Sequence, residues 1–214
     1  MQINSRPIGL EHPTYFVADI AANHDGDLSR AIDLIHQAAE AGADAVKFQN
    51  FKAETIVSDK GFLDLRSVSS HQSEWKESVF ETYKKASLSL DWTEKLRDAS
   101  LQAGVDYFTA PYDLQLIDEL DPYVCAWKIG SGDINWLELI HILSKLNKPL
   151  LIATGASTLA DVDNAMNVAL NHTKDIVLMQ CNTNYTASLD NFKYVNLQVL
   201  SLYANRYPGV VLGL

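Results

Sequence analysis

The chain has 214 residues, 47% of them hydrophobic and 21% charged, which is a globular composition with enough apolar residues for a sizeable core. Its formal net charge of −10 and its pI of about 4.9 argue against nucleic acid and anionic membranes as partners. There is no signal-peptide pattern and no run of about 18 apolar residues, so we expect a cytoplasmic protein with no membrane partner.

Seven short apolar segments predict strands, and segments of helical period lie between most of them. The strands are expected at residues 15–21, 45–49, 106–110, 126–130, 150–154, 176–180 and 210–214. The helices are expected at residues 28–41, 91–103, 114–120, 136–146, 159–170 and 192–206. This alternation indicates right-handed βαβ units and a parallel sheet.

Several residues are typical of helix ends. Gly42 and Gly104 lie just past two predicted helices, where a left-handed residue is often needed. Asp27 is the expected N-cap of the first helix, and Ser157 or Thr158 is expected to cap the helix at residues 159–170.

Polar residues gather where the predicted strands end, as in a (β/α)8 barrel (TIM barrel), whose active site lies at the carboxyl ends of its strands. A doubly wound open sheet usually has a glycine-rich phosphate loop after its first strand, and residues 22–27, ANHDGD, are not such a loop. The last residues form the seventh predicted strand. We therefore expect residues 1–214 to be a single α/β domain, an incomplete barrel from a longer protein; a naturally short open sheet is the alternative.

One insertion, residues 52–85, separates the second strand from the next regular helix. A long insertion after a strand is usually a substrate lid or binding loop, and this one is expected to contain a helix of its own. Trp75, Phe80 and Tyr83 have helical spacing, which favours a packing stripe over a cofactor site.

No metal site is predicted within the chain. Cys125 and Cys181 lie in apolar runs and are expected to be buried thiols, because there is no CxxC motif or Cys/His cluster. Four histidines lack metal-ligand spacing and are expected at the surface: His36, His71, His141 and His172.

Two lysines lie within apolar strands, Lys47 in AVKFQN and Lys128 in AWKIGSGD. A lysine in a sheet covered on both faces must be paired or must face water, since burying an isolated ammonium group is costly. Each lysine could form a structural salt bridge. At the mouth of a barrel, however, the two would attract a phosphate, a carboxylate, or both.

Further polar residues surround this predicted anion pocket. Asp19, in the first strand, is a candidate acid/base or hydroxyl ligand, or else a buried carboxylate that caps a loop. Asn23 and His24 precede the first helix, and His24 could contact a substrate or anchor the turn. Short side chains that could donate hydrogen bonds follow the later strands: Thr109, Ser131, Thr154, Asn182, Thr183 and Asn184. Glycines in IGSGD and ATGA would allow backbone N–H groups to approach a ligand.

Six segments, in this order and spacing, resemble the sialic acid synthase family, also called NeuB-like: ADIAANHDGD, AGADAVKFQNFKAET, FTAPYD, WKIGSGD, IATGAS and QCNTNYTAS. The resemblance covers residues 14–214. It implies a (β/α)8 barrel followed by an antifreeze-like C-terminal domain, which is absent here, and a domain-swapped homodimer. It also implies a transferase that condenses phosphoenolpyruvate with an N-acetylmannosamine-type aldose, forming a sialic acid or related nonulosonate and releasing phosphate.

The resemblance also implies roles for individual residues. Lys47 and Gln49 would bind phosphoenolpyruvate from the second strand, and Thr109, Lys128 and Ser131 from the next two. Asp133, where relatives often have glutamate, would lie near the sugar, and Tyr185 with its polar neighbours would line the sugar side. The residues expected to be catalytic are Asp19, Lys47 and Lys128.

The chain departs from the family pattern at three places. Asp19 stands where the family usually has glutamate, and Ala153 where many relatives have a serine that donates to phosphate. The family's Mn²⁺ or Mg²⁺ ligands would lie beyond Leu214. We therefore expect no metal to bind tightly to this chain and no synthase activity from these residues alone.

Two other functions remain open at this point. A barrel aldolase would use Lys128 or Lys47 as a Schiff-base amine. An inactive, truncated remnant would bind anions only or serve as an interaction module.

Overall fold

The computed structural model describes residues 1–64, 72, 75–183 and 188–214. The chain divides into two compact units, one of Phe16–Val124 and the other of Met1–Tyr15 with Cys125–Leu214. Every helix within the described ranges is too short or too polar to cross a membrane.

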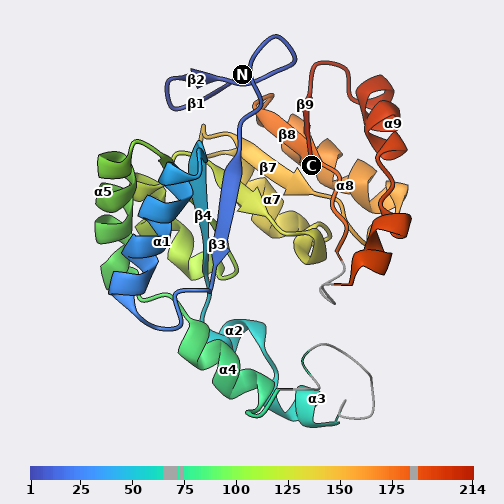
Figure 1. Cartoon of the computed structure of the whole chain (residues 1–214). Coiled ribbons are helices and arrows are strands. Elements are labelled where there is room, and N and C mark those ends of the chain that lie inside the picture. The colour runs from blue at the N-terminus through green and yellow to red at the C-terminus, as the bar shows by residue number, and fades with distance from the viewer. Residues whose placement is uncertain (65–71, 73–74, 184–187) are drawn as a thin grey trace. The chain divides into compact units, whose positions relative to one another are not determined.

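The unit of residues 16–124 contains three parallel strands in chain order, β3 (Val17–Ala21), β4 (Ala45–Asn50) and β5 (Asp106–Pro111). Helix α1 (Leu28–Glu40) connects β3 to β4, and α5 (Thr93–Ala103) precedes β5. The two helices lie side by side (Figure 1). The unit ends with η3 (Leu114–Leu116), α6 (Ile117–Leu120) and η4 (Asp121–Tyr123).

The predicted insertion forms short helices beyond the carboxyl end of β4 (Figure 1). They are α2 (Ala53–Ile56), α3 (Asp59–Asp64) and α4 (Val79–Ala86); η2 (Leu90–Trp92) follows the insertion and leads into α5. The ring of Tyr83 in α4 lies 5.5 Å from that of Phe51, just after β4, and 6.3 Å from that of Trp75. Of the predicted packing stripe of Trp75, Phe80 and Tyr83, the contact of Trp75 with Tyr83 is present, although Trp75 lies outside α4. The contact of Tyr83 with Phe51 attaches α4 to the end of β4.

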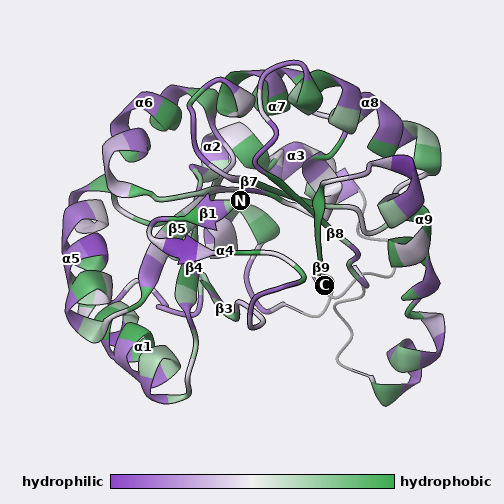
Figure 2. Ribbon diagram, turned by 90° about the horizontal axis from the view of Figure 1, so that it is seen from above, coloured by the Kyte–Doolittle hydropathy of each residue, from purple (hydrophilic) through white to green (hydrophobic). Residues whose placement is uncertain are grey.

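The other unit contains four parallel strands, β6 (Trp127–Ile129), β7 (Leu150–Ala153), β8 (Ile176–Met179) and β9 (Val211–Gly213). Between them lie η5 (Ser131–Asp133), α7 (Leu137–Ser144), α8 (Leu159–Leu170), η6 (Leu189–Tyr194) and α9 (Gln198–Arg206). Hydrophobic and hydrophilic residues are interleaved along α7 and α8, as expected for helices that bury one side (Figure 2). An N-terminal hairpin, β1 (Gln2–Ile3) with β2 (Arg6–Pro7), was not predicted.

Side chains alternate between the two faces of a strand, and in each unit one face carries a lysine. We call this the lysine face of each unit. Lys47 and Gln49 define it in the first unit, and Lys128 and Ala153 in the second. The opposite faces are almost fully buried, with no more than 1% exposure at Phe48, Asn50, Ile129 and Ile152, among others.

The predicted helix caps are confirmed. The Asp27 side chain accepts hydrogen bonds from the N–H groups of Ser29 and Arg30. Thr158 caps α8 in a reciprocal capping box with Asp161. Gly104 has a left-handed φ of 76°, as a residue just past a helix requires.

Two predictions about elements and thiols were wrong. The helix expected at residues 192–206 begins only at Gln198, because Val195 takes an extended backbone after η6. Cys181, predicted to be buried, is exposed because β8 already ends at Met179; Cys125 is half-buried, and neither cysteine forms a disulfide.

Three of the four histidines expected at the surface are at least partly exposed: His36, His141 and His172. His71 lies outside the described residues.

Candidate functional site

Lys47 forms an ion pair with Asp19 on the lysine face of the first unit. The two residues are register partners in β4 and β3, and Lys47 Nζ lies 2.8 Å from an oxygen of Asp19. The Lys47 side chain is only 8% exposed, whereas that of Asp19 is 59% exposed. Asp19 is therefore not a buried loop cap. An ammonium group has three donors, so Lys47 can hold Asp19 and a ligand oxygen together.

Gln49 shares this face with Lys47, but Thr109 does not. The register partner of Gln49 is Ala110, whereas Thr109 pairs with Phe48 on the opposite face. Thr109 is fully buried, and its hydroxyl donates to Asn50 Oδ1 at 2.6 Å. The structure therefore does not bring Thr109 together with Lys47.

Asn50 is a buried polar residue that the sequence analysis missed. It is fully buried at the end of β4, and its Nδ2 has no hydrogen-bond partner among the described residues. The available signal was a polar residue directly after an apolar strand, at the position next to Gln49.

The turn after β3 is held by Asn23 and His24. The pairing of β3 with β4 shifts between Asp19 and Ala21, which has a φ of 51°. Asn23 Nδ2 then donates to the Ile20 carbonyl at 2.9 Å. His24 Nδ1 accepts from the Gly26 N–H at 3.1 Å. Of the two roles predicted for His24, the structure shows the turn anchor, and substrate contact stays a prediction.

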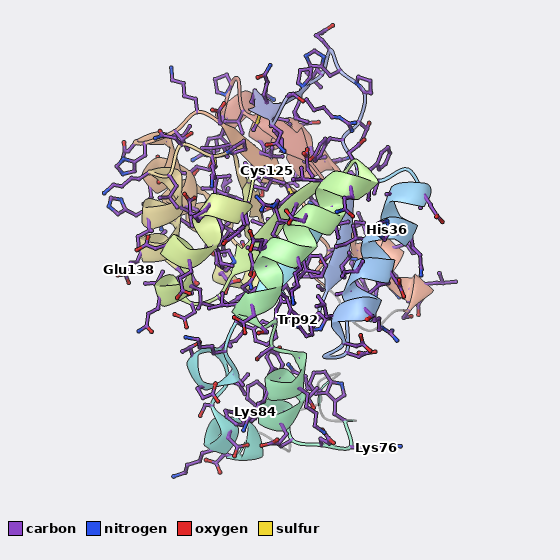
Figure 3. All side chains as sticks on the ribbon, turned by 90° about the vertical axis from the view of Figure 1, so that its left-hand side faces the viewer. His36, Lys76, Lys84, Trp92, Cys125 and Glu138 are labelled. Atoms are coloured by element: carbon purple, nitrogen blue, oxygen red, sulfur yellow. The ribbon has the colours of Figure 1, made fainter. Side chains whose placement is uncertain are left out.

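His24 is fully buried, and its ring lies 5.7 Å from that of Trp92, edge to face. Trp92 lies at the start of α5 (Figure 3). This burial lowers the pKa of His24, and the nearby charge of Asp25 opposes the shift only in part. Since Nδ1 accepts a hydrogen bond, the neutral ring carries its hydrogen on Nε2.

In the second unit, Lys128 lies close to Asp133. Lys128 Nζ donates to the Ile129 carbonyl at 2.7 Å, and its charge acts on the carboxyl group of Asp133. Burial raises the pKa of Asp133, while Lys128 lowers it. The net shift is upward, so Asp133 keeps its proton to a higher pH than an ordinary carboxyl group.

Ser131 is held by the turn that follows β7. Its Oγ accepts a hydrogen bond from the Gly155 N–H at 3.1 Å, and no described residue accepts its own hydroxyl hydrogen. A Cβ atom on Gly155 would lie 1.8 Å from Thr183 Oγ1 and 2.7 Å from the Cys181 carbonyl oxygen. Glycine is therefore required for this close approach, and Ser131 keeps a hydrogen to donate to a ligand.

Thr183 and Thr154 differ in what their hydroxyl groups contact. Thr183 Oγ1 is buried and has no partner among the residues described here. Thr154 lies on the side opposite the lysine face, where its hydroxyl donates to the Met179 carbonyl at 3.0 Å and accepts from the Tyr203 hydroxyl at 2.9 Å. The hydrogen of Thr154 is therefore already used within the protein.

The remaining predicted residues lie near the same turn or outside the described chain. Asn182 is exposed, and its Nδ2 donates to the Asn191 carbonyl at 3.2 Å. Asn184 and Tyr185 lie outside the described residues.

The described part of the chain contains no group of three or more His, Cys, Asp or Glu side chains positioned to hold a metal ion. We therefore derive no step through a metal. What the strands and the turns after them do supply is a lysine in each unit, a carboxyl group beside it, and hydroxyl and backbone donors.

A family description matches most of the chain: the NeuB family, over residues 34–214. The chain is 32% identical over 191 residues to the N,N'-diacetyllegionaminic acid synthase of Campylobacter jejuni, covering 87% of this chain and 56% of that enzyme. It spans about half the length of the curated relatives it matches.

Solved structures have the same fold. The crystal structure of the spore coat polysaccharide biosynthesis protein SpsE from Bacillus subtilis matches with a TM-score of 0.80 and 30% identity, over 100% of this chain and 55% of that one. The N-acetylneuraminic acid synthetase of Leptospira borgpetersenii, in complex with citrate, matches with a TM-score of 0.83 and 21% identity. The match covers 100% of this chain and 68% of that one. With the parallel βα units, this likeness confirms the predicted fold class, α/β of the (β/α)8-barrel type.

Proposed function

The chain belongs to the NeuB family. We therefore propose that it functions as part of a nonulosonate synthase, which condenses phosphoenolpyruvate with the open-chain aldehyde of an N-acetylmannosamine-type sugar. Relatives named as synthases of legionaminic acid, pseudaminic acid and N-acetylneuraminate 9-phosphate support this class of product. The observation that carries the proposal is the lysine within a strand of each unit, beside a carboxyl group and near hydrogen-bond donors.

The reaction forms one carbon–carbon bond and releases phosphate. The methylene carbon of phosphoenolpyruvate attacks the aldehyde carbon, water adds to the neighbouring carbon, and inorganic phosphate leaves with its bridging oxygen. Lys47 is proposed to bind an oxygen of phosphoenolpyruvate while its ion pair with Asp19 holds the ammonium group of Lys47 in place. In the other unit, Lys128 and Ser131 are proposed to donate to oxygens of the same kind of ligand.

The proton needed at the sugar is assigned to Asp133. The aldehyde oxygen gains negative charge as the new bond forms and must be protonated. A carboxyl group whose pKa is raised by burial is protonated over a wider pH range than an ordinary one, which suits this role. Gln49 is proposed to position the ligand from the same face as Lys47.

Calorimetric titration with phosphoenolpyruvate tests the anion site directly. We expect the wild-type chain to bind, and Lys47→Ala to weaken binding by about 10- to 100-fold, the usual effect of losing a charged hydrogen bond. Lys95→Ala is the matched control, because it removes the same charge from an exposed position on α5. Equal weakening by both variants, or no binding by folded wild-type protein, would contradict the proposal.

A further inference from the structure

Tyr203 is a buried tyrosine in α9 whose hydroxyl reaches the turn beside Ser131. Its side chain is almost fully buried, with 3% of the residue exposed, and its hydroxyl donates to Thr154 Oγ1 at 2.9 Å. A buried tyrosine hydroxyl normally has a partner, and here that partner is the last residue before Gly155.

Thr154 is fixed by three hydrogen bonds to two partners. Its backbone N–H donates to the Met179 carbonyl at 2.9 Å, and its hydroxyl donates to the same oxygen at 3.0 Å. Tyr203 supplies the third hydrogen bond. With its own hydrogen used on Met179, the Thr154 hydroxyl can only accept from Tyr203, which fixes the direction of that contact.

The turn held in this way sets the hydrogen bonding of Ser131. Gly155 follows Thr154 directly, and its N–H donates to Ser131 Oγ at 3.1 Å. The turn is closely packed, since a Cβ atom added at Gly155 would lie only 2.7 Å from the Cys181 carbonyl oxygen. Because Gly155 follows Thr154 directly, a displacement of Thr154 would also move the N–H group that donates to Ser131 Oγ.

We propose that Tyr203 is a positioning residue, which holds the Thr154–Gly155 turn so that Ser131 accepts from Gly155 and directs its own hydrogen to an oxygen of the anionic ligand. Ser131 touches the ligand, and Tyr203 acts only through the turn. This inference rests on the proposed function, because it assigns the ligand of Ser131 as phosphoenolpyruvate.

The first test compares two tyrosine variants in α9 and at its end. Tyr203→Phe keeps the ring and removes the hydroxyl, so we expect a folded protein that binds phosphoenolpyruvate about three- to tenfold more weakly, as for loss of one hydrogen bond. Tyr207→Phe is the matched control: it removes a hydroxyl that bonds to Asp163, away from the turn. Equal weakening by the two variants would overturn the proposal, because it would indicate a general packing effect.

A double-mutant cycle with Ser131→Ala tests whether Tyr203 acts through Ser131. We expect Tyr203→Phe to change the affinity by less than about twofold when Ser131 is already alanine. A loss as large as in the wild-type background would overturn the proposal, since an effect independent of Ser131 is additive.

Amide hydrogen exchange followed by NMR separates this inference from the proposed function, because it needs no ligand. We expect the Gly155 amide to exchange faster in Tyr203→Phe than in wild type, and to remain unchanged in Tyr207→Phe. Unchanged Gly155 exchange in Tyr203→Phe would overturn the positioning role. Failure of the wild-type chain to bind phosphoenolpyruvate would contradict the proposed function. The exchange rate of the Gly155 amide would still decide whether Tyr203 positions the turn.

Discussion

At Gly155 the space left for a side chain is smaller than one methyl group. The hydroxyl of Thr183 could rotate away from an added Cβ, but the carbonyl oxygen of Cys181, 2.7 Å away, belongs to the backbone and cannot. The backbone dihedral angles at Gly155 are not in the left-handed region, so the restriction is steric.

We therefore expect Gly155→Ala to lower the free energy of unfolding by about 1–3 kcal/mol, the usual cost of overpacking. Phosphoenolpyruvate binding should weaken as well, because the turn must move away from Ser131. Gly132→Ala is the control, since nothing lies within 4 Å of its added Cβ. Urea denaturation of both variants measures the difference, and equal stability would show that the turn can adapt.

Residue types could be predicted from the sequence more readily than the faces they occupy. Lys47 was recognisable because burying an isolated ammonium group in an apolar strand is costly, so the lysine must have a partner, a ligand or water beside it. Thr109 and Thr154 have the same polar character, but both lie on the faces opposite the lysines, where protein groups already bond to them. If a strand is shifted by one residue relative to its neighbour, its side chains exchange faces. The local sequence around Thr109 and Thr154 has no pattern that decides on which face each side chain lies.

Helix α1 is the element whose start depends most clearly on one side chain. Asp27 accepts from the Ser29 N–H at 2.7 Å and from the Arg30 N–H at 3.1 Å. These two donors have no partner within the helix, and the negative charge is also favourable at the helix N-terminus.

We expect Asp27→Ala to lower the free energy of unfolding by about 1 kcal/mol, and Asp27→Asn to restore most of it, because asparagine caps almost as well. Asp33→Ala controls for the lost charge, since Asp33 is exposed within α1 and caps nothing. Thermal or urea unfolding measures all three. A loss in Asp33→Ala as large as in Asp27→Ala would mean that charge, and not capping, is responsible.

Most elements could be predicted because their signals are local. The helix at Leu159–Leu170 has the predicted bounds, with a capping box before it and an apolar period within it. The hairpin of Gln2–Ile3 with Arg6–Pro7 could not be predicted in this way, because each strand has only two residues and so no period to detect.

For the whole molecule, the stability should depend on the protonation of His24. The pKa of His24 in the folded chain is lowered from its ordinary 6.5 because the ring is buried. As the pH falls below about 6.5, the unfolded chain binds this proton first, so protonation favours unfolding. The stability from neutral His24 is therefore present above that pH and is lost as the pH falls through the folded-state pKa.

We expect the wild-type free energy of unfolding to decrease over this range more steeply than that of His24→Asn, whose side-chain oxygen can still accept from Gly26. His36→Asn is the control, because His36 is exposed on α1. Chemical denaturation at a series of pH values gives the three slopes. Equal slopes for wild type and His24→Asn would show that another group causes the loss of stability at low pH.

At this scale the sequence was sufficient for the fold class, since alternating strands and helices with polar strand ends leave few architectures. It could not supply the pairing of distant side chains, such as Tyr203 with Thr154, because that depends on how a helix packs 49 residues further along the chain.

The exposed thiol of Cys181 offers a native attachment point for a spectroscopic label. Its own carbonyl oxygen packs against Gly155, and Thr183 is two residues away, so a fluorophore or spin label on this sulfur would be sensitive to events at the turn. Cys125 is half-buried, so a thiol-specific reagent should modify Cys181 faster. Ligand arrival at Ser131 could then be followed in real time on a chain with no engineered cysteine.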